Sequence, residues 1–349
     1  MPALTDIPSV SVVGACDRDA ARRDRAAARW KVPTFADYDD MLSTATPEVV
    51  VVATPPEHHA DACIKAFAAG AHVICEKPLA TTIGEGRKVL DAANAANRRV
   101  ALNYEFREMA IAAAVREQIG RPDVGTLIFA HVWQSMDLPP WKEPGWRGEL
   151  SRGVLFEAGI HLVDYALALF DERPVSVSAT MSTCGVRDER TDSVALAALE
   201  FPRGRLAQIT QNRLSPGDSR YFEVSADCTG ASLRASFGGR ARLSLGMVRS
   251  RKPHLRLEYG QSGLAWREHG ASRRVIGRNP RDAGMHATKR LLTKTLAAFA
   301  DGTDAPANGD VGLLGLEVLA ACYNSADTGA RVTLDAASMS RLADFPIGR

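Results

Sequence analysis

The sequence lacks the residue patterns that mark several large classes of protein. Its six cysteines form no CxxC pair and show no metal-site spacing, so we expect free thiols and no bound metal. No secretory signal peptide and no apolar run of membrane-spanning length is present. The net charge is only +2, and the densest basic run, residues 249–252, is short enough to be a solvated turn or strand face. We therefore expect a cytoplasmic protein that binds neither nucleic acid nor a membrane.

What remains is the composition of an ordinary globular protein. Hydrophobic residues make up 46% and charged residues 24% of the 349 residues. A chain of this length is typical of two domains or of one large one. No internal repeat and no long low-complexity segment is found. The domain boundary must therefore be inferred from the order of the expected strands and helices.

Strands and helices are expected to alternate over residues 1–104. The segment 48–53 contains four consecutive valines without polar alternation, which is typical of a strand buried on both faces of a parallel sheet. Helical segments separate this strand from its neighbours. We expect these residues to form a doubly wound parallel sheet of the Rossmann type, in the α/β class. The expected strands are Val10–Cys16, Pro33–Phe35, Glu48–Ala53, His72–Cys75 and Val100–Asn103.

Beyond residue 105 the pattern changes to closely spaced strands. Glycine and proline separate them, which favours an antiparallel sheet. We expect residues 105–349 to form an α+β domain, with helices near 107–119 and 154–170 and two helices near 285–300 and 311–327. The expected strands are Thr126–Gln134, Val175–Met181, Ser193–Phe201, Leu206–Asn212, Tyr221–Ala226 and Leu233–Phe237.

Polar residues follow several of the expected parallel strands, at the edge where α/β folds bind ligands. Glu76-Lys77-Pro78 follows the strand His72–Cys75 and places an amine there, although a solvated lysine at a strand end would look the same. Asp17 follows the strand Val10–Cys16, where an acid can bind the ribose of a dinucleotide. Alternatively, Asp17 or Asp19 caps the next helix. Asn103 ends a further strand.

Histidines appear in two of the candidate segments. His59 begins a helix after the rigid turn Thr54-Pro55-Pro56, and it can be structural or face a cofactor, since no metal-ligand partner is suitably spaced. Glu157 and His161 are four residues apart on an expected helix, so an acid can fix the tautomer of the imidazole. The same pair could instead only stabilise the helix.

These segments together resemble the glucose–fructose oxidoreductase / inositol dehydrogenase / rhizopine-catabolism (Gfo/Idh/MocA) family. The resemblance rests on Thr54-Pro55-Pro56 with His59, on the stretch 69–78 that ends in Glu76-Lys77-Pro78, and on Glu157-x-x-x-His161-x-x-Asp164. The segment 323–332 is also similar to the family's last helix and strand. The resemblance implies an N-terminal Rossmann domain and a C-terminal domain with a large open antiparallel sheet. It also implies hydride transfer between NAD(P) and a hydroxyl-bearing carbon of a sugar or polyol.

The resemblance also implies roles for individual residues. Lys77 matches the active-site lysine, and His161 matches the imidazole that acts as general acid or base. Glu157 stands where an aspartate is commoner, so its carboxylate is shifted by one methylene. A cis Lys77-Pro78 bond is expected. The remaining candidates are Asp17, Arg18, Thr54, Pro55, Pro56, His59, Glu76, Lys77, Pro78 and Asn103 for the cofactor and, from their positions, Tyr104, Trp146 and Arg147 for the substrate.

One part of the family pattern is absent from this sequence. A first strand ending in a G-x-G-x-x-G turn should precede Val10, but no such glycine pattern is found there. We therefore expect about twenty residues of the pattern to be missing, which leaves the neighbouring strands with unpaired edges and the pyrophosphate without its helix N-terminus. Either the polypeptide begins upstream, or the chain is a degenerate relative that binds the cofactor poorly.

The sequence leaves the cofactor and the activity open in defined ways. Asp17 favours NAD because a carboxylate repels a 2′-phosphate, whereas Arg18 beside it could accept that phosphate, so NADP is possible. The alternatives to a dehydrogenase are a catalytically silent scaffold or regulatory subunit and an NAD-assisted glycoside hydrolase of the same family. An open sheet face needs cover, so we expect a homodimer or homotetramer and a carbohydrate-like small-molecule substrate.

Overall fold

The chain folds into two compact units in a computed structural model. The structure describes residues 2–142, 145–186, 191–217, 219–237, 241–247, 253–259 and 263–348, so the basic run 249–252 lies outside the described residues. The first unit comprises Met1–Tyr104 and Thr288–Leu316, and the second comprises Glu105–Ala287 and Glu317–Arg349. The chain therefore passes from the first unit to the second after residue 104 and returns to the first unit for residues 288–316.

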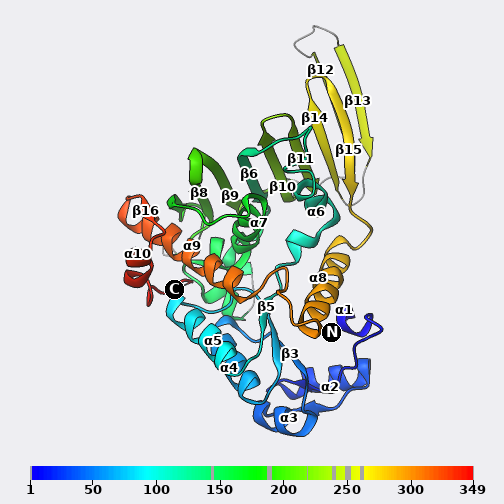
Figure 1. The fold of residues 1–349 in the computed structure, drawn as a ribbon, viewed down its shortest axis with the longest axis vertical. Coiled ribbons are helices and arrows are strands. Elements are labelled where there is room, and N and C mark those ends of the chain that lie inside the picture. The colour runs from blue at the N-terminus through cyan, green and yellow to red at the C-terminus, as the bar shows by residue number, and fades with distance from the viewer. Residues whose placement is uncertain are drawn as a thin grey trace. The chain divides into compact units, whose positions relative to one another are not determined.

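The first unit contains the parallel strands of a Rossmann-type fold, which confirms the expected class (Figure 1). Strands β3, β4 and β5 form one parallel sheet, and β1 and β2 form a second one. Helices separate the strands along the chain, as expected. The elements are α1 Pro2–Thr5, β1 Ala15–Cys16, α2 Ala20–Trp30, β2 Thr34–Phe35, α3 Tyr38–Ala45, β3 Val49–Val52, η1 Pro56–His58, α4 His59–Ala68, β4 His72–Cys75, α5 Ile83–Ala95 and β5 Val100–Leu102.

The first expected strand is much shorter than the sequence predicted. A strand over Val10–Cys16 was expected, but only Ala15–Cys16 pairs, with Thr34–Phe35 of β2. A strand persists where a neighbour takes up its backbone hydrogen bonds. Residues 10–14 have no such ladder in the described part of the chain, and Val10 packs instead against a hydrophobic cluster that includes Ile7.

The returning segment completes the core of the first unit. The second half of α8 (Ala283–Ala300) brings Leu292 and Phe299 into a cluster with Ile74 of β4 and Ala101 of β5. The Phe299 ring also stacks on His72, with ring centroids 5.0 Å apart. Burying a side chain such as Phe299 contributes about 1.5–3 kcal/mol, which explains why these residues join the unit that holds β4.

The second unit is organised around a nine-stranded sheet. Its strand order is β15-β14-β11-β10-β6-β9-β8-β7-β16, and α6 and α7 pack against one of its faces (Figure 1). β12 Ala241–Met247 and β13 Pro253–Tyr259 form a separate antiparallel pair. The remaining elements are η2 Glu105–Glu108, α6 Ala110–Arg116, β6 Leu127–Ser135, η3 Pro140–Lys142, η4 Gly145–Glu149, η5 Val154–Gly159, α7 Ile160–Phe170, β7 Ser176–Ser182, β8 Val194–Phe201, η6 Pro202–Gly204, β9 Arg205–Asn212, β10 Arg220–Cys228, β11 Ser232–Phe237, β14 Leu264–His269, β15 Ser272–Arg278, α9 Gly309–Thr328, β16 Val332–Thr333 and α10 Ala336–Arg341.

This sheet is mixed, whereas the sequence predicted an antiparallel one. β6 and β9 pair in parallel, with Phe129 opposite Leu206, and the other neighbours in the sheet are antiparallel. Parallel neighbours need a long crossover connection, and here the chain between β6 and β9 includes α7 and two further strands. Strand spacing in the sequence could not reveal this, because it reports on consecutive strands and β6 and β9 are not consecutive.

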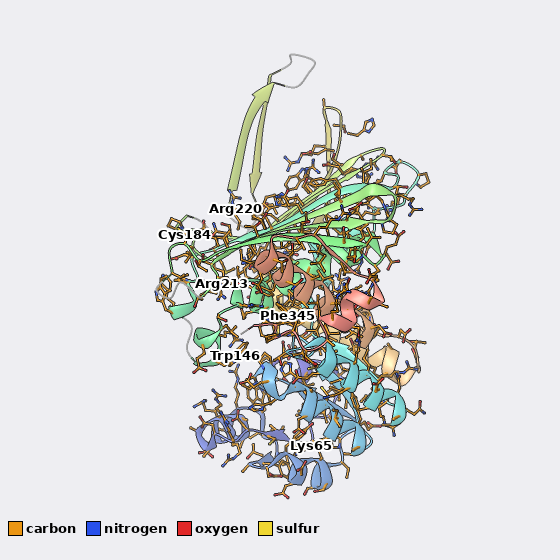
Figure 2. The ribbon with its side chains drawn as sticks, turned by 90° about the vertical axis from the view of Figure 1, so that its left-hand side faces the viewer. Lys65, Trp146, Cys184, Arg213, Arg220 and Phe345 are labelled. Atoms are coloured by element: carbon orange, nitrogen blue, oxygen red, sulfur yellow. The ribbon has the colours of Figure 1, made fainter. Side chains whose placement is uncertain are left out.

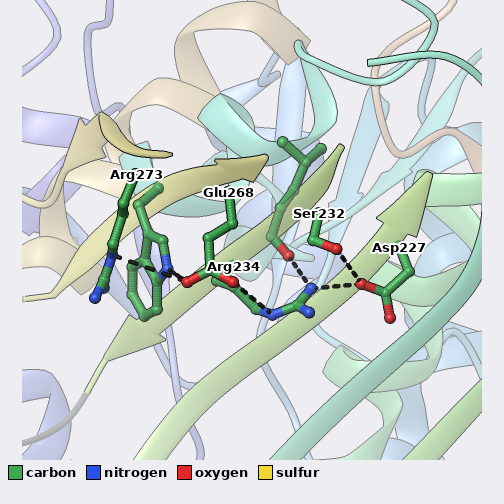
Figure 3. Close-up of polar contacts among 7 residues, drawn as sticks. Asp227, Ser232, Arg234, Glu268 and Arg273 are labelled. Carbon is green, nitrogen blue, oxygen red and sulfur yellow. Dashed lines mark hydrogen bonds and ion pairs between the residues drawn. The ribbon is translucent and has the colours of Figure 1, made fainter. Parts of the chain in front are cut away.

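The sheet face opposite α6 and α7 carries a cross-strand ladder of polar side chains (Figure 3). Arg234 Nη1 donates to Asp227 Oδ1 over 2.9 Å, and Ser232 Oγ donates to the same oxygen over 2.6 Å. The indole of Trp266 donates to Glu268 Oε1 over 2.7 Å, and Arg273 covers the Trp266 ring at 3.8 Å from its centroid. These contacts join β10, β11, β14 and β15 side by side and fix their register.

The expected single helix over 154–170 is divided in two. Val154–Gly159 forms a π-helical turn, and Ile160–Phe170 continues as the α-helix α7. Gly159 is needed at the junction, since a Cβ there would lie 2.6 Å from Leu155 Cδ2 and 3.1 Å from the Val154 carbonyl oxygen. The π-turn replaces regular α-helical geometry around Glu157, so the expected single α-helix does not run from Glu157 to His161.

Candidate functional site

In the first unit, three parallel strands end at the same level. Val52 of β3 is opposite Cys75 of β4, which is opposite Leu102 of β5. The backbone bonds continue beyond the strands: Glu76 N donates to the Val52 carbonyl over 2.8 Å, and Asn103 N donates to the Cys75 carbonyl over 2.9 Å. The residues that follow the strands therefore lie along one edge of the sheet, as the sequence predicted.

Two of these residues are joined directly. Asn103 Nδ2 donates to Glu76 Oε1 over 2.7 Å, so the ends of β4 and β5 are tied together by side chains as well as by backbone. Asn103 Oδ1 is buried and has no hydrogen-bond partner within the described residues. Lys77 follows Glu76 and is half-buried. The Lys77-Pro78 peptide bond is cis, which confirms that prediction.

His59 connects the two loops at this edge. Its Nδ1 lies 2.7 Å from the Pro78 carbonyl oxygen, and its Nε2 lies 2.8 Å from the Thr54 carbonyl oxygen. The side chain is almost completely buried, and burial lowers the pKa of the imidazole while the two carbonyl contacts oppose that shift. Of the two roles left open by the sequence, this geometry favours the structural one: His59 holds the loop of Pro55 and Pro56 against the loop that carries Lys77.

Asp17 lies at the other candidate position of this unit. Asp19 is the residue that caps α2, by accepting from Arg22 N over 3.1 Å. Asp17 Oδ1 accepts from Asp19 N over 2.9 Å, and its Oδ2 lies 3.5 Å from Arg22 Nη1, with a third of the side chain exposed. Asp17 also lines a hollow of about 650 Å³, whose other walls come from β1 and from the arginines and Trp30 of α2. The carboxylate is therefore accessible and in strongly basic surroundings.

In the second unit, His161 lies in the first turn of α7 and is mostly buried. Its ring stacks on Phe106, with centroids 4.4 Å apart and an interplanar angle of 13°. Glu105 Oε2 lies 3.8 Å from His161 Nδ1. Glu105 and Phe106 were not identified as site residues from the sequence. Their position directly after Asn103 and Tyr104, at the end of β5, could have indicated them.

Glu157 has a different set of neighbours from the one predicted. Its Oε1 accepts from Arg147 Nε over 3.2 Å, and the Arg147 guanidinium lies 4.6 Å from the ring centroid of Trp146. The loop residues Trp146 and Arg147 are thus brought to Glu157. A further residue that the sequence did not single out is Tyr221 of β10. Burial, followed by the charges of Glu105 and Glu157, raises the pKa of Tyr221 to about 12.

A buried ion pair supports this half of the site. Arg107 Nε donates to Asp164 Oδ2 over 3.0 Å, and its Nη2 bonds the other carboxylate oxygen, so the pair is bidentate. Burial raises the pKa of Asp164, and the guanidinium of Arg107 opposes that rise. Asp164, the last residue of the recognised motif, therefore anchors the segment Glu105–Glu108 to α7.

The predicted residues are distributed over both units. Lys77 belongs to the first unit, and His161, Glu157, Trp146 and Arg147 belong to the second, so their meeting at one substrate stays a prediction. Tyr104 has no exposed area, so the structure gives no support to its predicted contact with substrate. Among the described residues, no group of three or more His, Cys, Asp or Glu side chains could hold a metal ion. No helix in the described ranges is long and apolar enough to cross a membrane.

Comparison with known proteins gives two family models, one for each part of the chain. Residues 1–104 match a model described as an oxidoreductase family with an NAD-binding Rossmann fold. Residues 112–234 match a model described as the GFO/IDH/MocA C-terminal domain.

The curated relatives are oxidoreductases. A 1,5-anhydro-D-fructose reductase of Ensifer adhaerens is 29% identical over 178 residues, which cover 50% of this chain and 53% of that protein. An inositol 2-dehydrogenase of Rubrobacter xylanophilus is 27% identical over 64% of this chain and 62% of that protein. The matches thus span about half to three-fifths of the length of these relatives.

Solved structures share the fold over nearly the whole chain. An oxidoreductase from Agrobacterium radiobacter, crystallised with NAD+, L-tartaric acid and magnesium, superposes with a TM-score of 0.80 at 15% identity, covering 96% of this chain and 94% of that one. An aldose-aldose oxidoreductase from Caulobacter crescentus, crystallised with glycerol, gives a TM-score of 0.76 at 20% identity, covering 95% of this chain and 94% of that one. At such identities the likeness establishes the fold.

Proposed function

Because the chain belongs to the GFO/IDH/MocA oxidoreductase family, we propose that it moves a hydride between a nicotinamide cofactor and a hydroxyl-bearing carbon of a sugar, polyol or related compound. The observation that carries the proposal is the edge formed by Glu76, Lys77 and Asn103 at the ends of β4 and β5. This edge is where open α/β sheets bind their ligands. The names of the curated relatives, a sugar reductase and a polyol dehydrogenase, support the substrate class.

In the proposed reaction the cofactor exchanges a hydride with the substrate, and His161 exchanges a proton with it. The bound cofactor takes up or supplies the hydride. The Lys77 ammonium donates a hydrogen bond to the reacting oxygen and stabilises the charge that develops as its proton leaves. His161 takes that proton in the oxidation direction and returns it in the reduction direction, a role that suits an imidazole near neutral pH.

The residues at the two ends of the expected cofactor site fit a dinucleotide. Asp17 offers a partly exposed carboxylate beside a hollow, which suits the hydroxyls of an adenosine ribose. At the other end, the buried Asn103 Oδ1 is an acceptor without a hydrogen-bond partner among the described residues, and the Asn103 amide is bonded to Glu76, the residue before Lys77. A glycine-rich pyrophosphate turn is not part of the printed sequence. We propose NAD as the cofactor, because the Asp17 carboxylate would repel a 2′-phosphate.

NADP remains the competing choice, and α2 provides the reason. Arg18 follows Asp17, and Arg22, Arg23, Arg25 and Arg29 line the same hollow. Guanidinium groups are good partners for a phosphate. Titrating the protein with NADH and NADPH by isothermal calorimetry separates the two cases: NAD preference predicts weaker NADPH binding, and Asp17→Ser should narrow or reverse the difference. Equal affinity in the parent chain would contradict the proposed preference.

For the second unit we propose the substrate-binding and assembly roles. Trp146 and Arg147 lie beside Glu157, and together they offer an aromatic face and polar groups that suit a sugar. The open sheet face would be covered by a second copy in a homodimer or homotetramer. All six cysteines are free thiols, which agrees with a location in the reducing cytoplasm.

The test of the function follows the absorbance of the reduced nicotinamide while the protein is offered a panel of sugars and polyols. Lys77→Met should lower turnover by about a hundredfold or more, since a positioned charge at the reacting oxygen is lost. The matched control is Lys65→Met, because Lys65 is a partly exposed lysine of α4 (Figure 2) and pairs with Asp39 at 3.1 Å, away from the edge that carries Lys77.

The alternatives give different results in the same assay. Cofactor binding without turnover on any substrate would favour a scaffold or regulatory subunit. Cleavage of a glycoside without net change in the nicotinamide would favour an NAD-assisted hydrolase. Equal turnover in Lys77→Met and Lys65→Met would contradict the proposed role of Lys77.

A further inference from the structure

The segment at the start of the second unit contacts α7 through three consecutive residues. Glu105 lies 3.8 Å from His161 Nδ1, and Phe106 stacks on the His161 ring. Arg107 forms the buried bidentate pair with Asp164, one turn further along α7. The aromatic stack and the ion pair fix the two residues that directly follow Glu105, so the position of its carboxylate beside the imidazole is built into the fold.

The acid that the motif suggested as the partner of His161 is engaged elsewhere. Glu157 lies in the π-helical turn before α7 and accepts from Arg147 Nε over 3.2 Å. Its charge is therefore balanced by the Arg147 guanidinium. Glu105 and Glu157 are thus both candidates for the partner of the imidazole. Their contacts place Glu105 at His161 and Glu157 at Arg147.

We propose that Glu105 is the positioning residue for His161, and that Glu157 serves the loop of Trp146 and Arg147. The inference rests on the proposed function, in which His161 carries the proton. A carboxylate at Nδ1 favours the tautomer with the proton on Nδ1, which leaves Nε2 free to take the proton of the substrate hydroxyl. The same carboxylate stabilises the imidazolium that this transfer produces. A distance of 3.8 Å exceeds a hydrogen bond, and such contacts commonly tighten when the substrate is bound.

Most of the other charged groups on the elements that pack against α7 pair with partners of their own. On the segment before α6, Glu108 pairs with Arg116 at 3.6 Å. On the strands that pack against α7, Arg205 pairs with Glu172. His131 lies on the other face of β6 from the fully buried Ala130 and Val132, with its Nε2 3.0 Å from Thr210 Oγ1. The remaining charged or titratable neighbours are Arg107 and Asp164, which pair together, Glu157, which pairs with Arg147, and Tyr221.

The decisive experiment measures the pKa of His161 by NMR, in the full chain without substrate. The signal is assigned by its loss in His161→Asn. Removing a negative charge next to an imidazole lowers its pKa, so Glu105→Gln should lower the His161 pKa by about 1 unit. Glu157→Gln should lower it much less. Glu105→Asp, which keeps the charge on a shorter side chain, should restore a large part of the shift.

The results separate a positioning role from a structural one. A folding defect in Glu105→Gln would remove the dispersed NMR spectrum, and Glu105→Asp then provides the comparison within a folded protein. An unchanged His161 pKa in Glu105→Gln, or a larger shift in Glu157→Gln, overturns the inference. Because the pKa is measured without turnover, this outcome is independent of the proposed function. If the shift is found and His161→Asn nevertheless keeps full activity, then the proposed function of His161 fails and the pairing stands.

Discussion

At the scale of single residues, His59 shows how a buried polar side chain can shape a site without entering its chemistry. Its two ring nitrogens lie within 2.8 Å of carbonyl oxygens from different loops, those of Thr54 and Pro78, and both loops border the edge that carries Lys77. The buried imidazole therefore links the two loops through polar contacts. The position of His59 in the family motif is thus explained by its contacts with the two loops.

We predict that His59→Ala destabilises the protein by about 2–4 kcal/mol, because it removes the polar contacts of the imidazole with the two loops and opens a cavity. Urea denaturation followed by circular dichroism measures the change. The neighbouring His58 is exposed and provides the matched control, since His58→Ala should change the free energy of unfolding by less than about 0.5 kcal/mol. Equal effects of the two substitutions would show that the two carbonyl contacts of His59 contribute little.

Asp192 is a second residue whose burial has a measurable consequence. Its Oδ1 accepts from Val154 N over 2.8 Å, at the start of the π-turn. Burial raises its pKa to about 7, although the Val154 bond opposes the rise. The folded protein therefore holds a proton that the unfolded chain releases near pH 4. The contribution of Asp192 to the free energy of unfolding is therefore greatest below about pH 4. It is lost as the pH rises from about 4 to 7, by up to about 1.4 kcal/mol per pH unit.

We predict that Asp192→Asn removes this slope, because the amide keeps an acceptor for Val154 N and does not ionise. The measurement is the difference in free energy of unfolding between the parent and the variant at several pH values from 4 to 8. The difference should grow in favour of the variant as the pH rises. Asp171→Asn, at an exposed position, should show no such trend, and a pH-independent difference for Asp192→Asn would refute the assignment.

At the scale of elements, the π-turn Val154–Gly159 determines how the motif residues are presented. Gly159→Ala would place a methyl group 2.6 Å from Leu155 Cδ2 and 3.1 Å from a backbone oxygen that cannot move away easily. We predict a loss of about 1–3 kcal/mol of stability through overpacking. Gly284→Ala is the control, because no atom lies within 4 Å of its added Cβ. Thermal unfolding of both variants tests this, and equal melting temperatures would contradict the tight packing at Gly159.

Most strands of the first unit could be predicted from the sequence, whereas the π-turn could not. The strands β3 and β4 were predictable from their unbroken runs of apolar residues. The expected burial of both faces of β3 was wrong, since Val51 is 40% exposed. The ends of these strands, and with them Glu76, Lys77 and Asn103, followed from chain order. The π-turn was not predictable, since its residues have ordinary helical character and only the packing around Gly159 distinguishes it. Glu105 was missed for a similar reason: its closeness to His161 depends on a contact between residues 56 positions apart.

At the scale of the whole molecule, the open face of the nine-stranded sheet is the feature that needs an explanation. The helices α6 and α7 pack against one face only. The other face exposes Leu196 of β8 and Leu206 of β9, each almost half accessible. The polar ladder from Asp227 to Arg273 continues on the same face over the strands beyond β6. An apolar centre beside fixed polar groups is the arrangement of a protein–protein interface.

We predict that the protein in solution is a dimer or tetramer held together through this face. Because the apolar centre would be buried against a second copy, Leu196→Arg with Leu206→Arg should place charges in the interface and lower the molar mass to that of the monomer. Multi-angle light scattering after gel filtration measures the mass, and circular dichroism checks that the sheet persists. Met285→Arg, a matched change at an exposed apolar position of α8, should leave the mass unchanged. A parent chain that already elutes as a monomer at micromolar concentration would refute the prediction, whereas a mass that falls only in the double variant would assign the interface to the strands of the open face.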